Sequence, residues 1–164
     1  MFEHLLSPAR IGSMELRNRI VMAPMGVEMV DDDGHANEAI IDYYGERARG
    51  GAGLIITEVG AIAYPRGANS THQLGFSEDR FIPDLRRLTD RIHENGGRIA
   101  AQLVHHGKMS RVDARNGDEV LVPSLPEWHG SYDMAADLTA EELGMMMAAV
   151  GGELRPNLKP MTTD

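Results

Sequence analysis

The sequence contains no cysteine and no long hydrophobic run. Without cysteine the chain cannot form a disulfide, a thiolate metal site or an iron–sulfur ligand of its own. Its apolar stretches are strand-length, so none predicts a membrane-spanning helix. Residues 1–6 also lack the basic start and long apolar stretch of a secretory signal. We therefore expect a cytoplasmic protein.

Basic residues are scarce as well. The chain has 16 Lys and Arg against 25 Asp and Glu, a formal charge of -9. This charge repels nucleic acid and anionic membrane surfaces, and no basic stripe offsets it. We expect a small-molecule substrate, with no nucleic acid and no membrane partner. At 164 residues the chain has the size of one domain, but it is shorter than the ~250 residues of a complete eight-stranded α/β barrel.

Strand-like and helix-like segments alternate along the chain. A short hairpin is predicted over residues 6–16. Strands are predicted at 19–25, 54–59 and 98–104, and helices at 37–48 and 79–95. Glycine pairs end both helices. Such a rhythm, with short links from helix to strand, predicts parallel strands with helices packed outside.

The carboxyl-terminal part is less regular. Residues 105–137 look like a loop, Thr139 and Glu142 form a capping box for a helix to Val150, and helix breakers follow from Gly151. We expect an α/β fold in which residues 1–150 form the first three βα units of a (β/α)8 TIM barrel. Residues 151–164 would be a divergent tail. A small three-layer sandwich is the alternative, but long loops after the strands favour the barrel.

Two segments carry candidate binding residues. Ala23, Pro24, Met25 and Gly26 end the first strand, where proline stops pairing and leaves backbone groups free. On the residues alone, a simple strand terminator is the favoured interpretation of this segment. Gln102 lies within a buried apolar strand, so its amide needs partners. Those partners are either neighbouring backbone groups or the heteroatoms of a ligand.

Other chemical constellations are weak. His105 and His106 are adjacent, so they point to opposite faces and cannot chelate one ion together, and no metal site is expected. Glu58 could be a general base, but a lone carboxylate is more often satisfied or solvated, and we do not predict that it is catalytic. Residues 50–53 place their glycines before a strand, which is the wrong order for a dinucleotide fingerprint.

Taken together, many short motifs resemble the old yellow enzyme family of FMN-dependent ene-reductases and 2,4-dienoyl-CoA reductases. The motifs are Pro8, Ile11-Gly12, residues 16–20, Ala23-Pro24-Met25, Tyr44, Arg47-Ala48, Ile55 to Glu58, Leu74-Gly75, Gln102-Leu103, His105 and Gly107. The resemblance implies an FMN-binding TIM barrel. It implies flavin contacts from Ala23, Pro24, Met25, Gly26, Val59 and Gln102. Lys108 stands where the family usually has arginine, whose forked side chain lysine does not reproduce.

The resemblance also implies an activity. In the family, hydride passes from NAD(P)H through FMN to an activated alkene. The substrate-anchoring and proton-donating residues come on and after a fourth strand, and the phosphate-binding residues come later, so we expect no catalytic residue in this chain. The alternatives are a truncated, non-catalytic half-barrel fragment and a small α/β binding domain. Exposed strand edges would favour a homo-oligomer or a complementary half-barrel as partner.

Overall fold

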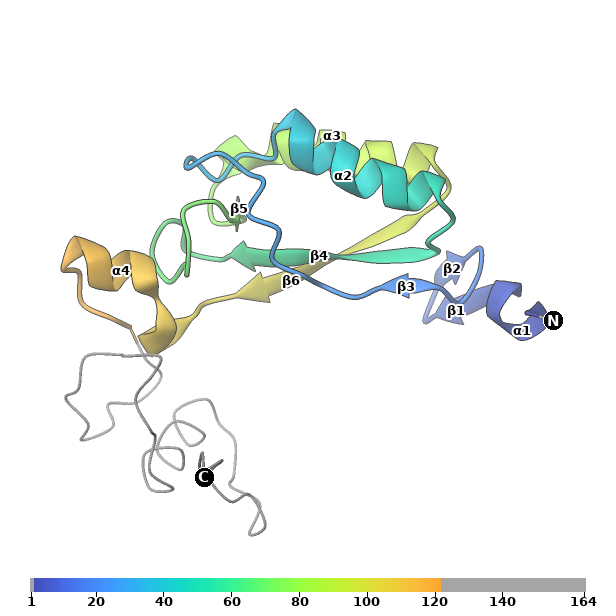
Figure 1. Cartoon of the computed structure of the whole chain (residues 1–164), viewed down its shortest axis with the longest axis horizontal. Helices are drawn as coiled ribbons and strands as arrows, with labels where there is room; N and C mark the ends of the chain where they lie inside the picture. Colours follow the sequence, from blue (N-terminus) through green and yellow to red (C-terminus); the bar gives the residue numbers. More distant parts are fainter. Residues whose placement is uncertain (1, 122–164) are drawn as a thin grey trace, which may run out of the picture.

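The structure is a computed structural model that describes residues 2–121 (Figure 1). Its elements are α1 (Glu3–Leu6), β1 (Ala9–Ile11), β2 (Met14–Leu16), β3 (Val21–Met22), α2 (Glu38–Arg49), β4 (Leu54–Ala61), β5 (Leu74–Gly75), the 3-10 turn η1 (Asp79–Phe81), α3 (Ile82–Glu94), β6 (Arg98–Val104), the 3-10 turn η2 (Gly107–Met109) and α4 (Arg111–Asn116). The alternation of strand and helix that the sequence predicts is therefore present.

The sheet is built around β4. β6 pairs with β4 from Leu54 to Ala61, whereas β3 pairs with the beginning of β4 and β5 with its end. Because β6 occupies one edge of β4, β3 and β5 share the other edge. All of these pairings are parallel, as predicted, so the carboxyl ends of β3, β4 and β6 point the same way.

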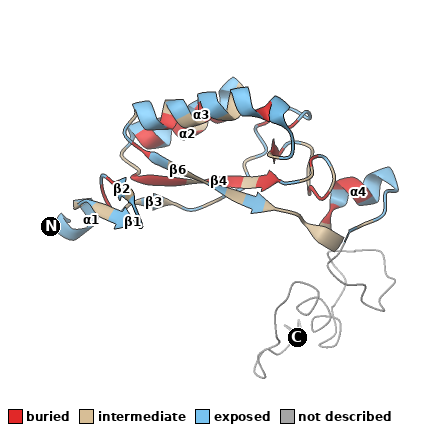
Figure 2. Cartoon of the chain, turned by 180° about the vertical axis from the view of Figure 1, so that it is seen from behind, coloured by how far each residue is buried: buried red, intermediate tan, exposed pale blue. Residues whose placement is uncertain are grey.

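Helices α2 and α3 lie side by side on one face of the sheet, and within residues 2–121 no helix covers the opposite face (Figure 1). One row of the sheet, Met22, Ile55 and Ile99, packs into the apolar layer beneath these helices. The buried members of that layer are Val30, Ala36, Ile40, Ile41, Tyr44, Ala48, Ile55, Leu74, Leu88 and Ile92. Full burial of each large aliphatic side chain contributes about 1.5–3 kcal/mol. Figure 2 shows the buried residues concentrated in β4 and on the inner sides of the helices.

Both helices lie where the sequence predicts them, although the predicted start of the second helix at residue 79 is the 3-10 turn η1 and α3 itself begins at Ile82. Asn37 caps α2, since its side-chain oxygen accepts the Ile40 N–H at 3.1 Å. Pro83 lies in the first turn of α3, where a missing N–H costs no hydrogen bond. The α3 helix closes at Gly96, whose N–H donates to the His93 carbonyl at 2.8 Å.

The predicted hairpin is present as antiparallel β1 and β2. Arg17, which follows β2, ties this hairpin to both helices. Its guanidinium donates to the carbonyls of Asn95 at 2.8 Å and Ala52 at 3.0 Å, and also to that of Ala48. A cation at helix carboxyl ends is favourable because the carbonyls there lack partners within the helix. One side chain thus stabilises the ends of α2 and α3 together.

Two other segments depart further from prediction. The first strand was expected over 19–25 but pairs only at Val21–Met22, since the chain then leaves the ladder before Pro24. The segment after β6 was expected to be a loop, yet it contains η2 and α4. Ser110 caps α4 by accepting the Asp113 N–H at 3.3 Å, a short Ser-x-x-Asp signal that we missed. The predicted helix at 139–150 and the tail at 151–164 lie outside the described residues.

Within residues 2–121, no helix is long and apolar enough to cross a membrane.

Arg17→Ala should destabilise the protein by about 1–3 kcal/mol, because two helix-end carbonyls and the Ala52 carbonyl in the link between α2 and β4 lose a charged donor. Urea unfolding measures the change. Arg10→Ala is the control, since Arg10 makes only an exposed 3.9 Å ion pair with Glu15 and should cost at most about 0.5 kcal/mol. Equal losses in the two variants would contradict the role given to Arg17.

Candidate functional site

The predicted binding residues all lie at or beyond the carboxyl halves of three adjacent parallel strands. Residues 23–26 follow β3, Val59 lies in β4 and Gln102 lies in β6. Residues there converge on one edge of a parallel sheet, which is where α/β barrels carry their binding sites. The structure therefore brings together three segments that are far apart in the sequence.

A β-bulge in β4 shapes this edge. Ile56 pairs with Ala100 and Val59 pairs with Gln102, so Thr57 and Glu58 lie opposite the single residue between those partners on β6. At the bulge, the Gln102 N–H points to the hydroxyl oxygen of Thr57, at 3.4 Å. The Thr57 side chain therefore takes the place of a backbone acceptor in the ladder. An extra residue shifts the side-chain alternation of a strand by one position.

The shift places Val59 on the open face of the sheet. Ile55 and Ile99 face the helices, so alternation along β6 directs Gln102 to the opposite face, and Val59 is its direct partner in the ladder. Both side chains are half-buried. The Gln102 carboxamide makes no hydrogen bond to any other residue in the described part of the chain. It therefore offers one acceptor and two donors to a ligand.

Residues 23–26 form an exposed strip beside β4. The Met25 side chain is 55% exposed, and a Cβ added at Gly26 would meet no atom within 4 Å. Backbone groups of this strip are open to a ligand. The Glu58 carboxylate reaches the backbone of the next two residues along the chain.

Glu58 is completely buried, with 0% exposure. Its Oε2 accepts the Val27 N–H at 2.8 Å and lies 3.4 Å from the Glu28 nitrogen, and its own N–H donates to the Tyr44 hydroxyl at 2.6 Å. Oε1 has no partner among the described residues. Burial raises the pKa of Glu58, against the lowering effect of the two backbone donors. Burial also raises the pKa of Tyr44 to about 12. The sequence interpretation of Glu58 as an ordinary strand-end residue missed this burial.

The loops beyond β4 and β6 are joined by a second buried carboxylate. Asp113 Oδ2 accepts the Gly67 N–H at 3.0 Å, and Arg66 Nε lies 3.3 Å from Oδ1. The His105 ring packs over Gly67, because a Cβ added at Gly67 would lie 2.4 Å from the nearest atoms of that ring. Burial, and to a lesser extent His105, lowers the pKa of His106. These contacts hold the loops after β4 and β6 together at the carboxyl edge of the sheet. In the sequence, only the Ser-x-x-Asp cap of α4 indicated this arrangement.

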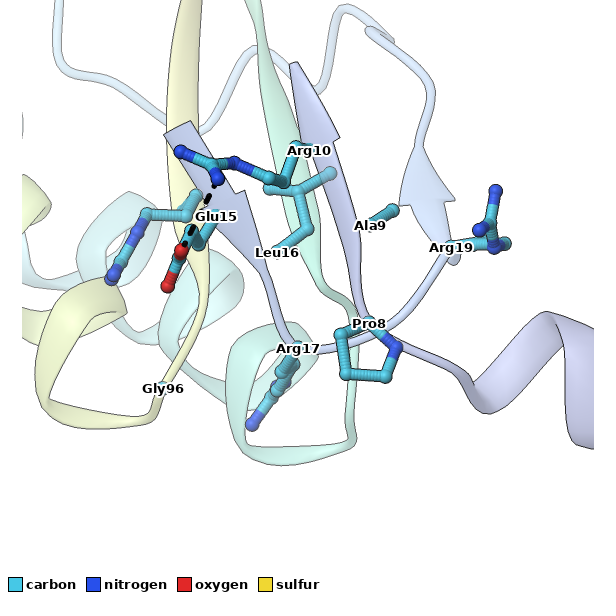
Figure 3. A pocket seen from close by; sticks show the side chains of 9 residues that line it. Pro8, Ala9, Arg10, Glu15, Leu16, Arg17, Arg19 and Gly96 are labelled. Atoms are coloured by element: carbon cyan, nitrogen blue, oxygen red, sulfur yellow. Dashed lines mark ion pairs between the residues drawn. The ribbon is translucent and has the colours of Figure 1, made fainter. Parts of the chain in front are cut away.

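A hollow lies at the opposite end of the strands. It has a volume of about 700 Å³ and is lined by Pro8, Ala9, Arg10, Glu15, Leu16, Arg17, Arg19, Gly96 and Arg98. Figure 3 shows these residues around the hairpin. Its arginines already have partners: Arg17 donates to backbone carbonyls, Arg10 pairs with Glu15, Arg19 donates to Ser7 at 3.2 Å and Arg98 donates to the Gly97 carbonyl at 3.4 Å. The hollow therefore does not compete with the carboxyl edge as a site. No group of metal-ligating side chains occurs among the residues described.

Comparison with known proteins identifies the family. Residues 4–148 match the model of the NADH:flavin oxidoreductase / NADH oxidase family. The chain belongs to this family. It is 38% identical to an NADH oxidase of Thermoanaerobacter brockii over 123 residues, which cover 75% of this chain and 19% of that protein. It is 37% identical to a metal reductase of Desulforamulus reducens over 145 residues, which cover 88% of this chain and 21% of that protein.

Solved structures agree. The old yellow enzyme from Trypanosoma cruzi matches with a TM-score of 0.60 and 36% identity, over 66% of this chain and 29% of that one. The resemblance to old yellow enzymes and the partial TIM-barrel fold are thereby confirmed. The chain spans about a fifth of the length of the curated relatives it matches.

The raised pKa of Glu58 predicts a pH dependence of folding stability. The folded protein holds this proton more tightly than the unfolded chain, whose carboxyl titrates near 4.5. The free energy of unfolding should therefore fall as the pH rises from about 4.5 through the raised pKa, with a slope of at most about 1.4 kcal/mol per pH unit. Glu58→Gln should lack this component.

Urea unfolding of both proteins between pH 4 and pH 8 isolates the contribution, because all other titrating groups are shared. A constant stability difference between wild type and Glu58→Gln over this range would show that the carboxyl is not perturbed.

Proposed function

We propose that this chain binds FMN at the carboxyl edge of its sheet and forms part of an oxidoreductase that moves hydride from NAD(P)H to an activated alkene. The observation that supports it most directly is the pairing of Val59 with Gln102 on the open face, beside the exposed strip 23–26. Family membership supplies the flavin and the nicotinamide as the expected cofactors.

The residues present fit a flavin. A planar heteroaromatic ring needs an apolar surface and in-plane hydrogen-bond partners, and Val59 and the Gln102 carboxamide provide these side by side. The strip 23–26 adds open backbone, with space above Gly26 for a ring to approach closely. When bound, FMN supplies hydride chemistry between NAD(P)H and the β-carbon of an activated alkene.

The chain's own residues bind and orient. The Gln102 carboxamide fixes the in-plane orientation of the ring, and Val59 excludes water from its face. A protein acid must deliver the proton that completes alkene reduction, and we assign that role to no described residue. The substrate is accordingly a small molecule, and the reaction suits a cytoplasmic pool of reduced nicotinamide.

A second candidate is a half-barrel that binds flavin only together with a complementary part. The observation in its favour is the open sheet: within residues 2–121, β3 and β6 each have an unpaired outer edge, and no helix covers the face that carries Val59 and Gln102. Strand edges and apolar faces of this kind pair with further strands. A second copy of the chain or another barrel segment would cover them.

Titration of FMN with the purified chain separates the two candidates. Quenching of the flavin fluorescence reports binding. Saturable binding at one FMN per chain, followed by NAD(P)H-dependent reduction of an enone, supports the enzyme. Binding that appears only when the chain oligomerises, with no turnover, supports the half-barrel. Absence of saturable binding under every condition contradicts both.

Gln102→Leu should weaken FMN binding about tenfold, because hydrogen bonds worth about 1–1.5 kcal/mol are lost while the shape is nearly kept. Leu103→Ala is the matched control, since Leu103 is the next residue of β6 and alternation directs it to the other face. It should leave the FMN dissociation constant unchanged. Equal effects of the two substitutions would contradict the proposed orientation of β6 toward the flavin.

A further inference from the structure

The described part of the chain contains one carboxylate that is fully buried next to the proposed flavin site, and the proposed function gives it no role. Glu58 has 0% exposure and points from β4 to the backbone just after the strip 23–26. Burying a charged group is costly unless the group is paired and hydrogen-bonded. The position of this carboxylate therefore calls for a physical reason.

We propose that Glu58 is a positioning residue that fixes the flavin-facing strip 23–26 through the backbone N–H groups of Val27 and Glu28. This inference rests on the FMN site proposed above. The strip leaves the ladder after Met22, so pairing with β4 no longer holds it. The carboxylate supplies the missing attachment with a bond of 2.8 Å to Val27 and a longer one of 3.4 Å to Glu28.

The backbone at the attachment point has an uncommon shape. Glu28 has φ of +49°, the one positive value at a non-glycine residue in the described ranges. A left-handed conformation at such a residue is unfavourable by itself and persists where surrounding contacts determine it. The N–H groups of Val27 and Glu28, which point at one carboxylate oxygen, lie directly at this turn. The turn and the carboxylate thus form one unit.

Glu58 is itself held from the opposite side. The bulge that begins at Thr57 gives the strand its extra residue, and the Tyr44 hydroxyl of α2 accepts the Glu58 N–H at 2.6 Å. Tyr44 is fully buried in the helix–sheet layer. The strip is therefore connected through Glu58 to the rigid core. Val59, the following residue, faces the flavin side from the same bulge.

Three substitutions at Glu58 test the attachment. Glu58→Ala removes it, and Glu58→Asp keeps the charge but withdraws the carboxylate by one methylene. Both should weaken FMN binding about tenfold. Glu58→Gln keeps an oxygen acceptor for Val27 and should bind FMN within about threefold of wild type. Rescue by glutamine but not by aspartate is the result expected of a positioning role.

Hydrogen exchange in the flavin-free full chain gives an independent readout. The Val27 and Glu28 amides should exchange about tenfold faster in Glu58→Ala and Glu58→Asp than in wild type, and near wild type in Glu58→Gln. Val112→Ala is the control for general destabilisation. Val112 is buried in a separate apolar cluster with Ala61, Tyr64, Ala68 and Phe81. It should leave both the FMN affinity and these two amides unchanged.

Results that would contradict the positioning role of Glu58 differ from those that would contradict the proposed function. Unchanged FMN affinity in Glu58→Asp despite faster exchange would overturn the positioning role, as would an equal loss of affinity in Val112→Ala. If Glu58→Ala does not fold, the aspartate and glutamine variants decide. If wild type binds no FMN, the proposed function fails and this role fails with it, while the exchange data still show whether Glu58 holds residues 27 and 28.

Discussion

The extra residue in β4 is the feature on which the site depends. Between the ladder pairs Ile56–Ala100 and Val59–Gln102, β4 contains one residue more than β6. A regular strand would turn Val59 toward the helices and Glu58 toward the open face. The bulge reverses both assignments. It buries the Glu58 carboxylate and turns the Val59 side chain to the open face. The chemistry of this edge therefore follows from a change in strand register.

The two faces of the sheet serve different purposes. Helices α2 and α3 cover one face with an apolar layer, which supplies the stability. The other face carries the half-buried pair Val59 and Gln102 and is free for a ligand or for further strands. A buried carboxylate next to this face lowers stability, as the raised pKa of Glu58 indicates. Such a local cost is characteristic of functional sites, where position matters more than stability.

The sequence predicted the regular elements well because their signals are local. Asn37 as cap and the apolar spacing of α2 and α3 depend on neighbouring residues alone, and the three parallel strands followed from their alternation with helices. Gln102 could be singled out because a polar residue stood in an apolar strand. The burial of Glu58 could not, since it depends on a bulge and on contacts with Val27 and Tyr44, which are distant in sequence. α4 was missed because its six residues show little periodicity.

Arg17 has a further consequence for a chain without cysteine. Its three acceptor carbonyls belong to residues 31, 35 and 78 positions away in the sequence. One guanidinium therefore closes two large loops of the chain at a single point, much as a covalent cross-link would. Unlike a disulfide, this closure needs no oxidant and forms and breaks reversibly. Through Arg17, the hairpin thus joins both βα units by hydrogen bonds, which do not depend on the redox environment.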